Sequence, residues 1–154
     1  MIAALLLLIA APGARETIGV YRGWGAFRDA SPPRCYAIAR PRVARRRSAG
    51  FATVATWPGR GLRASLHIRL SAPRDRETRL TLSVGERRFA LVGGVRDAWA
   101  ADAASDRALI GAIRSGRSMS VEAVAQNGRP FADVYALAGA ATAIDAATLA
   151  CAAG

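Results

Sequence analysis

The chain has no lysine, a single histidine and only two cysteines, and each scarcity narrows what the protein can do. His67 must serve any Ser–His–Asp or Cys–His mechanism, because it is the only imidazole in the chain. One histidine and two cysteines are too few ligands for a structural zinc site, so we predict no metal and no other cofactor. The glycine-rich steps at 59–61 and 93–94 lack the spacing of a phosphate-binding loop.

Long apolar runs are also absent, and no stretch reaches the ~20 residues that span a bilayer. The longest run, residues 2–11, carries no charge and is followed by small residues, which is typical of a secretory signal peptide. We therefore expect residues 1–14 to be a signal peptide, cleaved after Gly13 or Ala14. The mature chain would then be periplasmic or secreted, with no transmembrane segment. The alternative is a buried N-terminal strand or helix of the domain itself.

Acidic residues are half as numerous as basic ones, which gives a net charge of +11. The apolar fraction of 52% favours a globular fold, and we expect residues 15–154 to form one domain. A positive field attracts lipid headgroups, polysaccharide or nucleic acid. Nucleic acid conflicts with export, and the chain lacks the interleaving of basic and aromatic residues that single-strand binders use. We therefore expect no nucleic-acid partner.

One segment concentrates the positive charge. Five arginines lie within eight residues, Arg40, Arg42, Arg45, Arg46 and Arg47, on a segment broken by Pro41 and ended by Gly50. Such a loop can present forked donors to phosphate or carboxylate groups. We predict that it binds an anionic component of the envelope, such as a phosphorylated glycolipid. The alternative is a solvated hairpin loop that only keeps the domain soluble.

The two cysteines, Cys35 and Cys151, lie 116 positions apart. In an exported protein an even count favours one disulfide, whereas in a reducing cytosol two separate thiols are expected. Closing so long a loop stabilises the fold by up to about 4–5 kcal/mol in the chain-entropy model. The rival outcome is a buried free thiol at Cys35 and an exposed Cys151 that forms intermolecular dimers.

Alternation of apolar and polar residues predicts that the middle of the chain is β. The clearest pattern runs over residues 62–71, and further strands are expected at 19–27, 35–39, 51–57, 80–84 and 88–92. Asn127-Gly128 predicts a type I′ turn between strands at 118–125 and 130–137. Ser105 or Asp102 can cap a helix near 105–115, and 140–150 predicts a short C-terminal helix. The expected fold is mainly β, a β-sandwich or flattened barrel of about seven or eight antiparallel strands.

The order of these segments resembles a known family. The run Ala108–Gly116 precedes the hairpin, and Leu137-Ala-Gly139 follows it. This resembles the C-terminal half of the invasion-associated locus B family of exported alphaproteobacterial proteins. There, a helix ending in a Lys/Arg-x-Gly step leads to a hairpin and a Leu-x-Gly segment. Trp24 and Cys35 resemble the family's first strand and nearby cysteine.

The resemblance implies a small, β-sandwich-like envelope protein, in a family linked in some bacteria to host-cell invasion. It implies no catalytic residues, because none are established for the family. Two departures concern the cysteines. Arg28 stands about where the family's first strand has a cysteine, and the paired cysteines before the helix are missing. Because the family's other cysteines are missing here, the resemblance implies that Cys151 is the only partner left for Cys35.

These observations favour a non-enzymatic, exported binding or structural module, whose partner is an anionic glycolipid or another envelope protein. The alternative is a periplasmic hydrolase centred on His67. Burial of His67, or a distance beyond about 8 Å from any Ser, Asp or Glu, would remove that alternative. We expect a solvated His67, helix-capping roles for Asp97, Asp102 and Asp106, and a core position for at least two of the three tryptophans.

Overall fold

The computed structural model describes residues 13–42 and 50–152. Nearly all of the predicted signal peptide lies outside these residues, as do Arg45, Arg46 and Arg47. The described residues form ten strands, two α-helices and one 3-10 turn, η1 (Pro58–Arg60). The other elements are β1 (Arg15–Tyr21), β2 (Trp24–Ala30), β3 (Pro33–Ala39), β4 (Phe51–Trp57), β5 (Leu62–Arg69), β6 (Thr81–Val84), β7 (Arg87–Gly93), β8 (Asp97–Ala100), α1 (Ala103–Ser115), β9 (Ser118–Val124), β10 (Pro130–Ala136) and α2 (Ala140–Ala152).

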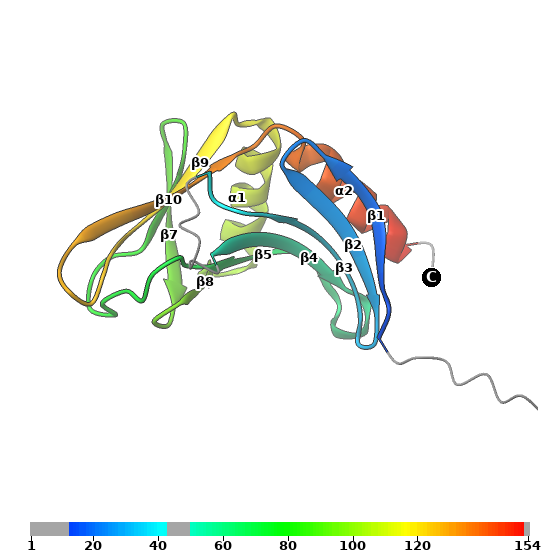
Figure 1. Cartoon of the computed structure of the whole chain (residues 1–154), viewed down its shortest axis with the longest axis horizontal. Coiled ribbons are helices and arrows are strands. Elements are labelled where there is room, and N and C mark those ends of the chain that lie inside the picture. The colour runs from blue at the N-terminus through cyan, green and yellow to red at the C-terminus, as the bar shows by residue number, and fades with distance from the viewer. Residues whose placement is uncertain (1–12, 43–49, 153–154) are drawn as a thin grey trace, which may run out of the picture.

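The strands form one open antiparallel sheet in the order β1-β2-β3-β4-β5-β8-β7-β6-β9-β10. A mainly β fold with two helices is therefore confirmed, but the sheet has ten strands and is neither a sandwich nor a closed barrel. The reason is that helices, rather than a second sheet, cover its apolar face. Figure 1 shows β1–β5 arching across the molecule, with α1 and α2, the two α-helices of the described residues, both on the outer side of the arch.

Both helices bury an apolar stripe against the sheet. Asp102 caps α1, accepting a 2.7 Å hydrogen bond from the Ser105 backbone N–H, and Leu109 and Ile113 are fully buried beneath the helix. Facing them are alternate residues of the strands, such as Leu66 and Ile68 of β5. The core thus lies between the helices and one sheet face. No helix among the described residues is long and apolar enough to cross a membrane.

Two strands were missed because their boundaries carry weak sequence signals. The predicted strand at 19–27 is in fact β1 and β2, which turn at Arg22 with a φ of 57°. A left-handed arginine is uncommon, so nothing in the sequence marked this turn except Gly23. Strand β8 has only four residues, too few to show a clear alternation.

The predicted hairpin joins β9 and β10, but its turn is not type I′. Only Gly128 has a positive φ, at 79°, and its N–H donates to the Ala125 carbonyl at 2.8 Å. The Asn127 side chain instead accepts from the Arg129 N–H at 3.1 Å. The loop is therefore longer than a two-residue turn, and the Asn127 amide stabilises it by a local hydrogen bond.

Trp24 and the segment at 136–139, which both belong to the sequence pattern that resembles the family, are in contact. The fully buried indole of Trp24 donates to the Ala136 carbonyl at 2.9 Å. Three residues later, Gly139 has a φ of 88°, and a Cβ there would lie 2.0 Å from the Tyr21 carbonyl oxygen. Only glycine satisfies both conditions. The junction of Trp24 with 136–139 thus joins the start of the sheet to the segment that leads into α2.

The structure joins Cys35 of β3 to Cys151 near the end of α2 in a disulfide, with Cα atoms 5.8 Å apart. The pairing matches the sequence prediction. Cys35 is fully buried on the helix-covered face, and α2 packs along β1 to β4. The bond therefore fastens the C-terminal helix across the strands that form the arch.

Candidate functional site

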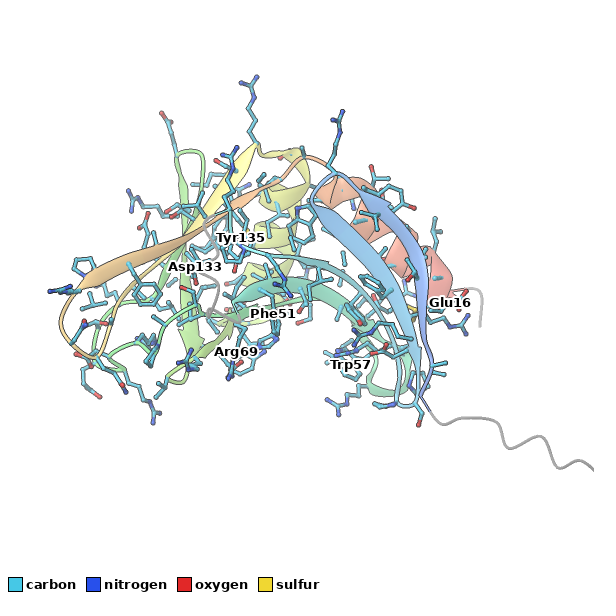
Figure 2. The ribbon with its side chains drawn as sticks, viewed as in Figure 1. Glu16, Phe51, Trp57, Arg69, Asp133 and Tyr135 are labelled. Carbon is cyan, nitrogen blue, oxygen red and sulfur yellow. A yellow bond between two sulfur atoms is a disulfide. The ribbon has the colours of Figure 1, made fainter. Side chains whose placement is uncertain are left out.

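The concave face of the sheet is the surface that the helices leave open. On β2 to β5, side chains alternate between this face and the core, so residues in register across neighbouring strands share a face. Figure 2 shows Phe51, Trp57 and Arg69 on the concave side of the arch. The side chains gathered here are mainly arginine and aromatic residues, which is unusual for a solvated sheet face and makes it the candidate site.

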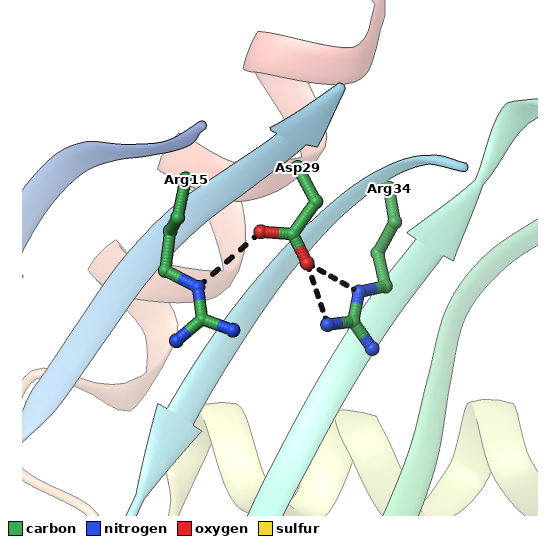
Figure 3. A network of polar contacts seen from close by, with 3 residues as sticks. All are labelled: Arg15, Asp29 and Arg34. Carbon is green, nitrogen blue, oxygen red and sulfur yellow. Dashed lines mark hydrogen bonds and ion pairs between the residues drawn. The ribbon is translucent and has the colours of Figure 1, made fainter. Parts of the chain in front are cut away.

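At one end of this face, one carboxylate holds two arginines. Arg15, Asp29 and Arg34 are in register on β1, β2 and β3. Asp29 accepts from the Arg15 Nε at 3.3 Å, and from the Arg34 Nε and Nη2 at 3.1 and 2.6 Å (Figure 3). Burial of Asp29 favours its neutral form, but the hydrogen bonds from Arg34 and Arg15 outweigh it and lower the pKa of the carboxyl. Asp29 therefore stays ionised and fixes both guanidinium groups.

The same arginines lie over aromatic rings. The Arg34 guanidinium carbon is 4.4 Å from the Tyr36 ring centroid and 5.0 Å from that of Trp57. Arg15 lies over Phe27 and Tyr36, and Arg60 of η1 lies 4.8 Å from the Trp57 centroid. Cation–π contact restrains a guanidinium plane while leaving its N–H edge free. We call these residues the arginine–aromatic cluster: Arg15, Phe27, Asp29, Arg34, Tyr36, Trp57 and Arg60.

Tyr36 lies at the centre of the arginine–aromatic cluster. It is 4% exposed, and its hydroxyl has no hydrogen-bond partner among the described residues. Burial raises the pKa of this hydroxyl, and the charge of Asp29 acts in the same direction. A neutral, buried and unpartnered hydroxyl is uncommon in folded proteins. It marks a place where the described side chains leave a polar group unsatisfied.

A hollow of about 750 Å³ adjoins the cluster on the concave face. Phe27 and Phe51 line it together with Ile38, and Arg15 and Arg40 add positive charge. Its volume is within the range of small-molecule sites, which are mainly apolar with a few polar groups. Arg40, one of the predicted binding residues, is thus placed beside the arginine–aromatic cluster.

The other predicted arginines are only partly placed. Arg42 is exposed, and its backbone N–H donates to the Val134 carbonyl of edge strand β10 at 2.7 Å. Arg45, Arg46 and Arg47 lie outside the described residues. Sequence analysis missed Arg15 and Arg34 because the predicted strands at 19–27 and 35–39 begin after them, whereas β1 and β3 include them. Their shared face follows from the register of β1, β2 and β3, which alternation within one strand does not give.

His67 lies further along the concave face and is not simply solvated. Its ring stacks on Trp99 with centroids 5.1 Å apart and meets the edge of Phe51 at 5.6 Å. Its Nε2 lies 2.9 Å from the Asp97 carboxylate, which also accepts from the Arg69 guanidinium. Asp97 is therefore not a helix cap, as the sequence suggested, but the partner of His67 and Arg69.

The criteria that would have removed a hydrolase are not met, because His67 is partly exposed and Asp97 is within hydrogen-bond distance. Among the described residues, no nucleophile is hydrogen-bonded to the His67 ring. The only hydrogen bond to the His67 ring among them is that with Asp97, and no serine, threonine or cysteine is bonded to it. A base needs such a partner for nucleophilic catalysis.

The tryptophans divide between the two faces. Trp24 is in the core, but Trp99 is 43% exposed on the concave face, and Trp57 lies there too. The expectation of two core tryptophans is therefore wrong. The reason is that Trp57 and Trp99 fall on the outward phase of β4 and β8, which local composition does not reveal.

The buried charged side chains have structural partners, whereas the hydroxyls of Ser83 and Tyr135, like that of Tyr36, are buried without a partner among the described residues. The Asp133 carboxylate accepts from the Ser71 N–H at 2.8 Å and also from the Ser71 hydroxyl. Arg74, only 5% exposed, donates to backbone carbonyls of its own loop and of Gly94. These contacts fasten β10 and the loop at 72–79 to neighbouring segments, and they leave no donor directed at the concave face.

The structure thus defines a class of fold, an open and strongly arched antiparallel sheet with two helices on its convex face. A solved structure described as invasion associated protein b from Bartonella henselae shares this fold. The two superpose with a TM-score of 0.66 over 90% of this chain and 99% of that chain, at 15% sequence identity.

At the level of sequence, no family model matches the chain and no curated protein matches it. The likeness to the Bartonella henselae protein therefore concerns the fold alone. It supports a fold like that of the family whose sequence pattern the chain resembles, but this fold is one open sheet and not the expected sandwich, and the likeness adds no site residue.

Proposed function

We propose that this protein is an exported, non-enzymatic module of the bacterial envelope that binds an anionic envelope component on its concave face. The observation that carries the proposal is the arginine–aromatic cluster, where cations are held in place on the sheet face opposite α1 and α2. Ordered, partly desolvated guanidinium groups bind phosphate and carboxylate more strongly than mobile surface charges do.

Three further observations support this setting. The disulfide fits an oxidising compartment. The structure with the same fold is described as an invasion-associated protein of a bacterium. Charge favours the same class of partner, since the chain carries a net +11. A phosphorylated glycolipid is the proposed partner, with Arg40, Arg42, Arg45, Arg46 and Arg47 as a second contact beside the cluster.

The test is binding of the mature chain to lipopolysaccharide and to anionic vesicles. Changing all five arginines between Arg40 and Arg47 to serine should weaken binding at low salt at least about tenfold, because several charge contacts are lost together. A matched control removes five exposed arginines elsewhere: Arg76, Arg79, Arg107, Arg117 and Arg129. Equal losses in both variants would show a diffuse field, and unchanged affinity in the first would exclude the segment.

The hydrolase alternative rests on one observation, the contact between His67 and Asp97. It predicts turnover of an ester or glycoside substrate that His67→Gln abolishes. Absence of such turnover by the mature chain, together with saturable anion binding that His67→Gln leaves intact, favours the binding module.

A further inference from the structure

We infer that Arg15 and Arg34, aligned by Asp29, form a binding site for a phosphate monoester. The inference deepens the proposed function, on which it rests, by naming the residues and the anion chemistry at one end of the concave face. It concerns Arg15 and Arg34 and not the arginine-rich segment 40–47, whose first residue, Arg40, lines the same hollow as Arg15.

Geometry is the first ground. Figure 3 shows Arg15 and Arg34 on either side of Asp29, with the terminal nitrogens of both extending in the same direction beyond the carboxylate. Asp29 occupies the Nε of Arg15 and the Nε and Nη2 of Arg34. Both terminal nitrogens of Arg15 and the Nη1 of Arg34 have no acceptor among the described residues. Two parallel forks with free donors suit an anion with several oxygens.

Charge is the second ground. Within the cluster, Asp29 is the one carboxylate and faces three guanidinium groups, those of Arg15, Arg34 and Arg60. The cluster thus has a net charge of about +2, and a phosphate monoester carries about −1.5 to −2 at neutral pH. A diester or a carboxylate, with a single charge, neutralises only half of it.

Restraint is the third ground. Strands β1, β2 and β3 are hydrogen-bonded neighbours, and the rings of Phe27, Tyr36 and Trp57 lie under the guanidinium planes. Arg34, with two hydrogen bonds to Asp29 and two rings beneath it, is therefore preformed and has little freedom to lose on binding, whereas the Arg15 side chain is 60% exposed and is held by a single bond. The Tyr36 ring lies beneath the same two arginines.

The experiment measures binding of glycerol 3-phosphate to the mature chain by calorimetry at 0.15 M salt, where a diffuse field is screened beyond about 8 Å. Dimethyl phosphate is the diester control. We expect saturable binding of the monoester and at least about tenfold weaker binding of the diester, because one charged contact is lost. Failure of the wild-type chain to bind the monoester would overturn the inference.

The variants separate a positioned site from charge alone. Arg34→Gln and Arg15→Gln should each weaken monoester binding at least about tenfold. Arg34→Lys keeps the charge but loses the fork, so it should weaken binding nearly as much, while Arg107→Lys on α1 should not. Wild-type affinity in Arg34→Lys would overturn the inference. An unchanged circular dichroism spectrum and an intact disulfide verify the fold of each variant.

Two further experiments are needed. One distinguishes a lipid headgroup from a soluble phosphate ester, and the other tests the proposed function independently of this site. If the monoester belongs to a lipid headgroup, the chain should bind vesicles with phosphatidic acid more tightly than phosphatidylglycerol vesicles of equal charge. Arg34→Lys should then remove this preference. Binding of glycerol 3-phosphate without that preference assigns the site to soluble phosphate esters. The variant with serines at 40–47 should keep monoester binding, so its loss of vesicle binding tests the proposed function separately.

Discussion

At the scale of single residues, the fold depends on a few groups that have no substitute. Trp24 is fully buried and donates its indole N–H to the Ala136 carbonyl, so it fills volume and satisfies a backbone acceptor at once. Trp57 and Trp99, on the concave face, neither fill core volume nor satisfy a buried backbone acceptor. Residue type alone therefore does not indicate which tryptophan matters for stability.

Trp24→Phe should lower the free energy of unfolding by about 1–3 kcal/mol, because it leaves a small cavity and an unpaired carbonyl. Urea denaturation followed by circular dichroism measures the change. Trp99→Phe is the matched control, and since Trp99 is 43% exposed its effect should stay below about 1 kcal/mol. Equal effects of the two substitutions would contradict the assignment of Trp24 as the core anchor.

Gly139→Ala should destabilise far more than Gly128→Ala. Both glycines have positive φ, so each substitution costs about 1 kcal/mol for conformation. At Gly128 a Cβ meets nothing within 4 Å, whereas at Gly139 it overlaps the Tyr21 carbonyl. The added clash should bring the loss at Gly139 to at least about 2–3 kcal/mol. Similar losses in thermal denaturation would show that 136–139 does not pack on the first turn as described.

At the scale of elements, an ion pair joins the two helices and a disulfide joins α2 to the sheet, while Asp106 of α1, which was expected to cap its helix, accepts from the Leu66 N–H of β5 at 3.0 Å. Arg114 of α1 donates to both oxygens of Asp145 of α2 at 2.7 and 3.1 Å. Cys151 fastens α2 to β3. The first link depends on pH and the second on redox conditions, so the two are separable by experiment.

The hydrogen bond from Arg114 lowers the pKa of Asp145. A carboxyl with a lowered pKa in the folded state stabilises the fold above its unfolded pKa, and this stability is lost as the pH falls through the folded pKa. Asp145→Asn should therefore reduce stability at pH 7, by less than about 1 kcal/mol for so exposed a pair, and should approach the wild type near pH 3. Denaturation curves at both pH values test this, and a difference that persists at pH 3 would contradict it.

Reduction of the disulfide should lower the free energy of unfolding by up to about 4–5 kcal/mol, because the bond closes a loop of 116 residues. Cys35→Ala/Cys151→Ala in non-reducing buffer should match the reduced wild type. Thiol titration of the unfolded, unreduced protein should find no free thiol, and two free thiols per chain would contradict the bond.

Elements with strong local signals were predictable, whereas their arrangement was not. The alternation over 62–71 and the capped apolar stripe near 105–115 correspond to β5 and α1. The turn at Arg22 and the short β8 have no local signal, and the predicted strands began too late to include Arg15 and Arg34. Sheet order and curvature depend on contacts between distant residues, so local patterns contain no information on whether ten strands close or stay open.

At the scale of the whole molecule, the two sheet faces have different roles. The convex face is closed by α1, α2 and the disulfide, while the concave face carries the arginine–aromatic cluster and the cluster around His67. Substitutions on the convex face should change stability, and those on the concave face should change binding. Arg34→Gln should therefore shift the midpoint of unfolding little compared with Trp24→Phe.

The junction between Trp24 and 136–139 also constrains how the chain acquires its structure. The second strand of the sheet reaches its final packing only when residues more than a hundred positions later are present. Contacts this distant in sequence slow folding, because a long loop must close before they form. A chain that emerges N-terminus first from a ribosome or a membrane channel therefore exposes β1 to β4 without their covering helix until α2 has emerged. The first strands of the sheet are therefore the last to reach their final packing.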